Sequence, residues 1–321
     1  MNPDLAKAIG DLVRRGVLPE DKAVRLRSIA RGELVSLYPE LRLLFYVGVL
    51  LSTAGIGILV KQNYENMGPA VIAAALGAAA LGTLLWVART ASPFSWNETP
   101  APYLAFDYLL LLGVLLAAAD LAFMEVQFTP LGAHWPWHLL IVSLFMACLA
   151  VRYDSRTVFS LALSTFAAWR GLSVSILEKQ LWRASEDIVR WNAIGCGIVF
   201  VLLGRYLTRC KRKSHFEPVS VHLGWLLILG ALVSGGTEQG TEGIAYILVL
   251  GLTGSGLAWH SFRQHRFALF AFGVLAVYVS AGQLVLKYSL DFMESLFWFV
   301  VSSAGLTALL WKVQRKMREQ V

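Results

Sequence analysis

Two opposite charges lie inside long apolar stretches of this 321-residue sequence: Asp120 in the stretch 103–124 and Arg170 in the stretch 157–177. An acidic residue at the centre of a membrane helix costs about 2.5–3.5 kcal/mol of insertion free energy, so Asp120 needs a polar partner or water. Both residues fall in the predicted outer half of their helices, and arginine can bind a carboxylate with two hydrogen bonds. We therefore predict an intramembrane charge pair, either a substrate or proton site or a lock between two helices.

A second group of charges lies at the predicted cytoplasmic ends of these stretches. Asp107 stands near the start of 103–124, and the turn RYDSR contains Arg152, Asp154 and Arg156. We predict that these residues form a cytoplasmic charged cluster, in which Asp107 lies within salt-bridge range of Arg152 or Arg156. Closing the ends of three helices is the favoured role for this cluster.

Polar candidates on the outer face are Glu125, Gln127, His134 and His138. The two histidines have the i, i+4 spacing of a metal pair on a helix, but Pro136 lies between them and no third ligand is near. We therefore predict no metal, no cofactor and no catalytic residue. The sequence contains no glycine-rich phosphate loop, nucleophile elbow or HExxH motif. This absence favours a protein that is not an enzyme.

The elements that position these residues are predicted membrane helices. The composition is 57% hydrophobic and only 15% charged, whereas soluble domains are about 25% charged. The excess forms ten blocks, each near the length that crosses a bilayer core of about 30 Å. They are 43–60, 68–88, 103–124, 136–151, 157–177, 191–208, 219–235, 244–261, 267–286 and 294–311. The short block 136–151 is either a full span or partly re-entrant.

The placement of basic residues predicts the topology. With a cytoplasmic N-terminus, segments predicted to be inside hold 22 of the 28 Lys and Arg residues, and segments predicted to be outside hold 5. This is the positive-inside bias of membrane proteins, and one helix more or fewer would spoil it. The sequence therefore predicts an all-α bundle of about ten transmembrane helices with both termini cytoplasmic. The segment GTEQGTEG (236–243) is then a tight acidic turn on the outer side.

Three regions follow from this reading. Residues 1–41 have apolar positions at helical spacing and are predicted to form a cytoplasmic helical hairpin. Residues 42–311 form the ten-helix transmembrane domain, and residues 312–321 form a basic cytoplasmic tail. Residues 1–40 lack the pattern of a cleavable signal peptide, so the first membrane helix is expected to direct insertion.

Several motifs resemble a known family. The segments LVRRGVLPEDKAVRL, YVGVLLSTAGIGILVKQN and FDYLLLLGVLLAAADLAF, with EVQF after them, are similar to the bacterial membrane-protein family called domain of unknown function 2157. The resemblance covers roughly residues 1–170 and includes Asp107, Tyr108, Gly113 and Gln127. It implies a bacterial inner-membrane protein with a short cytoplasmic N-terminal hairpin, and it implies no particular activity.

Three functions remain open on the sequence alone. Intramembrane charges and many small residues suit a transporter or flippase-like carrier of a small or lipid-linked solute. A non-transporting scaffold or regulatory subunit would instead use the N-terminal hairpin and the basic tail to hold a membrane or cytoplasmic protein partner. An intramembrane enzyme acting on a lipid-linked substrate is a lesser alternative. The lipid bilayer is the partner common to all three, and nucleic acid is not expected because the basic residues lie between apolar blocks.

Overall fold

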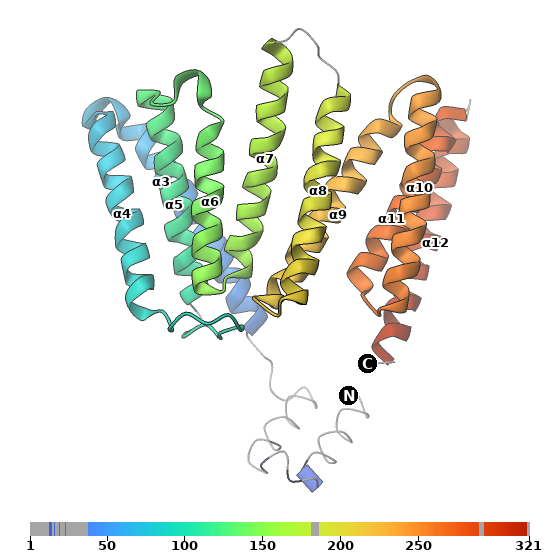
Figure 1. The fold of residues 1–321 in the computed structure, drawn as a ribbon, viewed down its shortest axis with the longest axis horizontal. Coiled ribbons are helices and arrows are strands. Elements are labelled where there is room, and N and C mark those ends of the chain that lie inside the picture. The colour runs from blue at the N-terminus through green and yellow to red at the C-terminus, as the bar shows by residue number, and fades with distance from the viewer. Residues whose placement is uncertain are drawn as a thin grey trace. The chain divides into compact units, whose positions relative to one another are not determined.

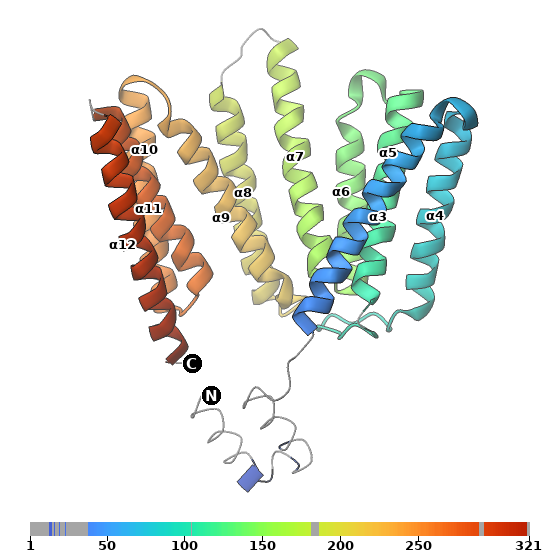
Figure 2. The same ribbon diagram turned by 180° about the vertical axis from the view of Figure 1, so that it is seen from behind.

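The computed structural model of the chain describes residues 13, 14, 16, 19, 23, 38–103, 105–180, 186–288 and 292–319. Every long regular element in these ranges is an α-helix, which confirms the predicted all-α class. The helices are α3 (Tyr38–Met67), α4 (Pro69–Thr90), α5 (Phe106–Phe128), α6 (Trp137–Tyr153), α7 (Arg156–Gln180), α8 (Glu186–Arg209), α9 (Glu217–Gly236), α10 (Gly240–Arg263), α11 (Phe267–Tyr288) and α12 (Phe292–Glu319). Each of the ten predicted apolar blocks corresponds to one of these helices (Figures 1 and 2).

Seven helices in the described part of the chain are long and apolar enough to cross a membrane. The spans are Pro69–Thr90, Phe106–Phe128, Asp187–Arg209, Ser214–Gly236, Gly240–Arg263, Phe267–Tyr288 and Leu296–Arg315. Shorter apolar helices cover Leu43–Leu59 and Trp137–Tyr153. The second of these is α6, a continuous helix of 17 residues and thus about 25 Å long. Its length is a little less than the apolar core of a bilayer, and its continuity favours a span over a re-entrant segment.

The chain divides into two compact units, Met1–Gly68 and Pro69–Val321. The first unit contains α3, whereas most of the hairpin predicted for residues 1–41 lies outside the described residues. In the second unit α12 continues to Glu319, so most of the predicted basic tail is the last part of this helix. The boundary at residue 312 stays a prediction, because a membrane helix can continue beyond the bilayer surface.

Within Pro69–Val321 the helices pack as sequential pairs: α4 with α5, α6 with α7, α8 with α9 and α10 with α11. The connections after α6 and α10 are short, and a chain that turns within a few residues returns beside the helix it has just left, whereas α4 and α5 pair across the longer segment 91–105. The turn between α6 and α7 is the shortest, with Asp154 in the left-handed conformation at φ 59°. One apolar core joins α4 to α8, and another joins α9, α10 and α11.

Glycines bring two of these pairs into close contact. A β-carbon on Gly224 of α9 would lie 2.6 Å from the carbonyl oxygen of Gly197 in α8. A β-carbon on Gly254 of α10 would lie 2.8 Å from the carbonyl oxygen of Gly273 in α11. Such close backbone approach is typical of small residues at membrane helix interfaces. The α8–α9 pair and the α10–α11 pair are therefore two tightly packed units.

Candidate functional site

A buried ion pair joins two turns at one end of the bundle. Asp154 follows α6, and Lys213 lies in the connection between α8 and α9. The Lys213 Nζ donates a 2.6 Å hydrogen bond to the Asp154 Oδ1, and both side chains are only 2% exposed. The two residues also share the left-handed conformation, with φ of 59° and 50°. That conformation is costly for residues other than glycine, so the surrounding packing must hold both turns in place.

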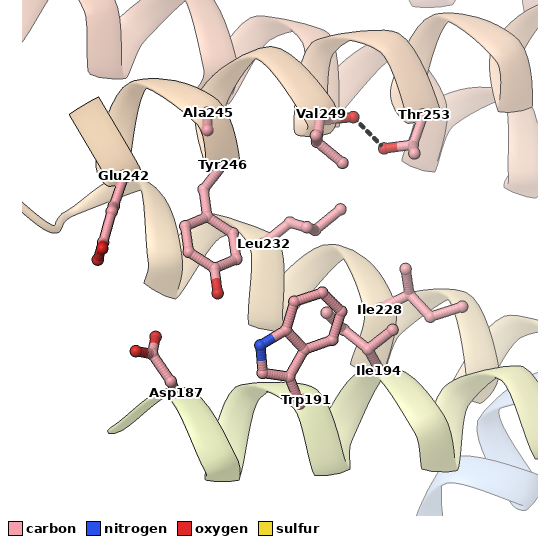
Figure 3. Close-up of a pocket in the computed structure, with 10 residues that line it drawn as sticks. All are labelled: Asp187, Trp191, Ile194, Ile228, Leu232, Glu242, Ala245, Tyr246, Val249 and Thr253. Atoms are coloured by element: carbon pink, nitrogen blue, oxygen red, sulfur yellow. Dashed lines mark hydrogen bonds between the residues drawn. The ribbon is translucent and has the colours of Figure 1, made fainter. Parts of the chain in front are cut away.

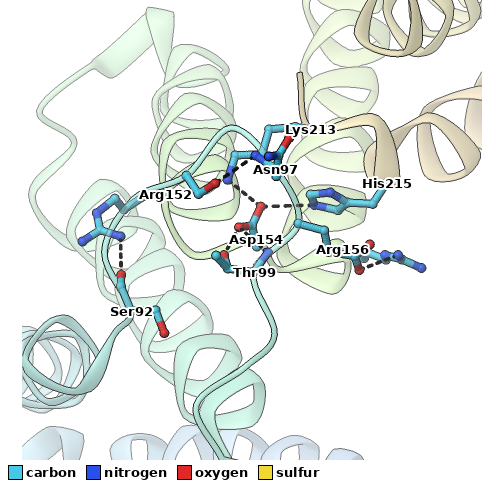
Figure 4. A network of polar contacts seen from close by, with 10 residues as sticks. Ser92, Asn97, Thr99, Arg152, Asp154, Arg156, Lys213 and His215 are labelled. Atoms are coloured by element: carbon cyan, nitrogen blue, oxygen red, sulfur yellow. Dashed lines mark hydrogen bonds and ion pairs between the residues drawn. The ribbon is translucent and has the colours of Figure 1, made fainter. Parts of the chain in front are cut away.

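His215 and Thr99 complete the surroundings of the Asp154 carboxylate (Figure 4). The His215 Nε2 lies 3.2 Å from Asp154 Oδ1, at ion-pair distance but without the alignment of a hydrogen bond. Thr99 donates to Oδ2 through its hydroxyl and, at 3.3 Å, through its backbone N–H. We call Thr99, Asp154, Lys213 and His215 the Asp154 cluster, and the part of the bundle around it the Asp154 end. The cluster fastens together three connections that are far apart in the sequence.

The loop after α4 strengthens this junction from its other side. The Lys213 N–H donates a 2.8 Å hydrogen bond to the Trp96 carbonyl oxygen. Lys213 Nζ lies 4.8 Å from the ring centre of Phe94, and the Arg212 guanidinium lies 4.9 Å from that of Trp96. These cation–π contacts hold the loop against the α8–α9 connection.

The structure places Arg152 and Arg156 of the predicted cytoplasmic cluster near Asp154. Arg152 donates a 3.2 Å hydrogen bond to the Ser92 carbonyl oxygen, and Arg156 forms a 2.7 Å ion pair with Glu98. Both guanidinium groups thus contact the loop after α4, close to Asp154 in Figure 4. Asp107 lies in the first turn of α5, and its pairing with Arg152 or Arg156 stays a prediction. Lys213 and His215 were not among the predicted site residues, because the basic run before α9 indicates only topology in the sequence.

The structure gives Asp120 and Arg170 different neighbours. Arg170 donates a 2.7 Å hydrogen bond to the amide oxygen of Asn192 in α8. Asp120 packs over Gly77 of α4, where a β-carbon would lie 3.0 Å from its Oδ2. Its buried Oδ1 has no hydrogen-bond partner among the described residues. The structure therefore does not bring Asp120 and Arg170 together, because each side chain faces another helix.

The outer polar candidates have local contacts. The buried Glu125 carboxylate accepts a 3.2 Å hydrogen bond from the Leu131 N–H and so holds the turn after α5. His138 Nδ1 lies 2.6 Å from the Trp135 carbonyl oxygen, and its ring stacks on Trp135. His134 lies in a short 3₁₀ helix, Gly132–His134, and Gln127 lies in the last turn of α5. No group of three or more potential metal ligands occurs in the described ranges.

A second polar cluster lies at the opposite end of the bundle, which we call the Arg190 end. Arg190 of α8 is 4% exposed and pairs with Asp187 at 2.9 Å and with Glu238 in the turn between α9 and α10. Lys287 of α11 donates a 2.6 Å hydrogen bond to the Glu238 carbonyl oxygen. The segment 236–243 does contain the expected tight turn, since α9 ends at Gly236 and α10 begins at Gly240. Its acidic residue binds arginine, so this turn joins α8 to α11.

An apolar cavity lies near the Arg190 end, between α8, α9 and α10 (Figure 3). Its volume is about 520 Å³. The carboxylates of Asp187 and Glu242 lie on one side, near the hydroxyl of Tyr246, and the remaining wall is mostly aliphatic, with Trp191 and Thr253. The lining residues are Asp187, Trp191, Ile194, Ile228, Leu232, Glu242, Ala245, Tyr246, Val249 and Thr253. We call it the outer cavity.

A larger cavity of about 730 Å³ lies between the same helices and α11, at the Asp154 end. It differs in charge, because three arginines and one glutamate line it. The lining residues are Val201, Leu202, Arg205, Tyr206, Thr208, Arg209, Glu217, Val221, Trp225, Leu257, His260, Ser261, Gln264, Arg266 and Leu269. We call it the inner cavity.

One face of α9 forms part of both cavities. Val221 and Trp225 line the inner cavity, and Ile228 and Leu232 line the outer one. These spacings of three and four residues keep the side chains on one helix face. Trp225 and Ile228 are less than one turn apart, so about 5 Å of helix separates the two linings. Both cavities therefore border the same face of α9, and we call the region along this face, between the α8–α9 pair and the α10–α11 pair, the furrow.

None of the polar residues singled out from the sequence lines either cavity. A pattern of polar residues inside apolar blocks draws attention to Asp120 and Arg170, whereas the cavity walls are mostly ordinary apolar residues. The signal that was available is the pair Arg205 and Arg209, which share one face of a helix at i, i+4 spacing.

The fold and these clusters define a class, the multi-span α-helical membrane proteins. Residues 10–159 match the family described as "Predicted membrane protein (DUF2157)", which confirms the resemblance found in the sequence. The match ends before α8, so both cavities lie beyond it. No curated protein and no solved structure shows a significant match to the chain.

Proposed function

We propose that this membrane protein is a carrier that moves an amphipathic, lipid-like solute along the furrow between the α8–α9 and α10–α11 pairs. The observation that supports this function is the pair of cavities at opposite ends of one face of α9. A solute with an apolar body matches the aliphatic walls, and a polar head matches the charged residues at both ends. The cavities have the size range typical of ligand sites.

The packing of the two helix pairs supports a rocking motion between them. Glycine contacts hold each pair together internally, as Gly197 with Gly224 and Gly254 with Gly273. Near the Asp154 end a partly exposed ion pair between Arg266 and Glu217 links the two helix pairs. Rigid bundles that move about a central barrier are the usual basis of alternating access. Trp225 and Ile228 form that barrier in this proposal.

The orientation is part of the proposal. Basic residues gather at the Asp154 end, and this bias favours a cytoplasmic position for it. The Arg190 end then faces outward, both termini are cytoplasmic, and the membrane is the bacterial inner membrane. The inner and outer cavities take their names from this orientation.

Filling the outer cavity is expected to slow transport. The test uses vesicles that contain fluorescently labelled phosphatidylglycerol. In vesicles without the protein, dithionite quenches only the label in the outer leaflet. The carrier should make the inner-leaflet label accessible to dithionite as well. Thr253→Trp should lower this rate by about tenfold, since the added ring opposes passage with a cost of about 1–3 kcal/mol. The matched control is Leu252→Trp, because Leu252 is 74% exposed and points away from the cavity. Equal rates for both variants, or no exchange above empty vesicles, would refute the carrier and favour a scaffold.

The proposed orientation predicts which residues a membrane-impermeant maleimide reaches from outside. Cys210 is exposed at the Asp154 end, and Gln239 is exposed in the turn at the Arg190 end. In a chain with the other cysteines replaced, Gln239→Cys should label in intact cells, whereas Cys210 should label only after the membrane is opened. A reporter fused after Val321 should indicate cytoplasm. The reverse labelling pattern would overturn the orientation and leave the fold unchanged.

A further inference from the structure

The inner cavity has an excess of positive charge. Arg266 forms an ion pair with Glu217, the one carboxylate in the lining. Arg205 and Arg209 lie one turn apart on α8, and neither pairs with a carboxylate among the described residues. Two guanidinium groups on the same wall are therefore available to a ligand, and guanidinium groups favour phosphate oxygens.

A buried hydroxyl adds a second, independent indication of a polar ligand. Ser261 of α10 lines the inner cavity and is 1% exposed, yet its Oγ has no hydrogen-bond partner in the described part of the chain. A buried hydroxyl without a partner costs free energy, so a bound acceptor would stabilise the site. Ser261 lies on α10 and the two arginines lie on α8, so two helices contribute polar side chains to the cavity lining.

Apolar side chains make up the remaining wall. Leu202, Val221, Trp225, Leu257 and Leu269 line the cavity on α8, α9, α10 and α11. A free phosphate ion would gain no binding free energy from this apolar surface. The acyl chains of a lipid would gain binding free energy, because the surface shields them from the polar headgroup layer. An arginine pair beside a mostly aliphatic wall is complementary to an anionic amphiphile.

The position of the cavity is that of the headgroup layer. Tyr206 lines it and is 63% exposed, and Trp259 on α10 is 64% exposed with the Arg263 guanidinium 4.7 Å from its ring centre. Exposed tyrosine and tryptophan mark the membrane interface, and arginines at the cytoplasmic surface attract anionic lipids. The cavity therefore lies where a phospholipid headgroup would be.

We propose that the inner cavity binds the phosphodiester headgroup of an anionic phospholipid of the inner leaflet. Arg205 and Arg209 bind the phosphate oxygens, Ser261 donates its hydroxyl hydrogen to a headgroup oxygen, and the acyl chains lie along the aliphatic wall. This inference rests on the proposed carrier function only where it identifies the bound lipid as the transported solute. Binding itself does not depend on transport.

The test measures lipid binding to the full chain in detergent by native mass spectrometry, with phosphatidylglycerol and phosphatidylethanolamine as probes. The double variant Arg205→Gln with Arg209→Gln should lower the affinity for phosphatidylglycerol about 30-fold, at about 1 kcal/mol for each arginine. Arg89→Gln with Lys312→Gln is the matched control, since both residues are exposed in the last parts of α4 and α12, lie outside the cavity lining, and the double variant removes the same charge. The control should retain the affinity of the unmodified protein.

Each outcome decides the proposal. Equal binding of the two lipids, equal loss in the two double variants, or competition by millimolar inorganic phosphate that matches binding of the lipid would overturn a phospholipid headgroup site. A folding defect is separated from a binding defect by the elution volume and helical circular dichroism of each variant. Selective phosphatidylglycerol binding without leaflet exchange leaves this site standing and refutes the carrier. Leaflet exchange at the same rate for both lipids and both double variants supports the carrier and refutes this lipid site.

Discussion

Replacing Asp154 by alanine is expected to lower the free energy of unfolding by about 3–5 kcal/mol, the cost of leaving a buried charge without its partner. Lys213 would keep its ammonium group in a site where the side chain is 2% exposed, next to the His215 ring. The loss of Asp154 would also release Thr99 and so loosen the loop after α4. Denaturant titration of the detergent-solubilised protein, followed by tryptophan fluorescence, measures this change.

The adjacent exposed ion pair provides a matched control. Arg156 and Glu98 are 54% and 56% exposed, so Glu98→Ala is expected to cost no more than about 1 kcal/mol. The double variant Asp154→Asn with Lys213→Met should recover much of the stability, because it removes both buried charges, nearly keeps the side-chain volumes, and asparagine tolerates the left-handed conformation. If Asp154→Ala and Glu98→Ala destabilised the protein equally, the Asp154 cluster would not be the junction that we describe.

A single methyl group at Gly224 or Gly254 is expected to lower the free energy of unfolding by about 1–3 kcal/mol, the usual cost of overpacking. The added β-carbon of Gly224→Ala would lie 2.6 Å from a backbone oxygen, and that of Gly254→Ala 2.8 Å from another. Backbone atoms cannot rotate away as a side chain can, so the paired helices must separate. Because the same contacts hold each pair rigid, both variants should also slow leaflet exchange in vesicles.

The same helices supply controls with the opposite sign. A β-carbon added to Gly230 on α9 or to Gly256 on α10 would meet no neighbouring atom within 4 Å, and both residues are exposed. Alanine at these positions is expected to raise stability by about 0.5–1 kcal/mol through the lower flexibility of the unfolded chain. Equal effects at Gly224 and Gly230 would show that α8 and α9 are not in close backbone contact.

Hydropathy and charge determined the list of helices. Each of the ten apolar blocks became a helix, because a segment of that length satisfies its backbone hydrogen bonds internally only when it is helical. The acidic segment 236–243 contains a tight turn for an equally local reason, since Gly236 and Gly240 flank residues 237–239. The family resemblance of the first half also came from the sequence alone.

The tertiary structure decided which polar residues meet. Matching depth along two helices suggested that Asp120 and Arg170 pair, yet Arg170 contacts Asn192 and Asp120 lies over Gly77. Depth fixes only the coordinate along the membrane normal, whereas a contact also requires that two helices are neighbours and that the side chains face each other. Lys213 reaches Asp154 across 59 residues for the same reason, because packing of helices α6 to α9 brings their connections to one place. The cavities likewise arise from the gap between two glycine-packed pairs, and no local sequence pattern encodes such a gap.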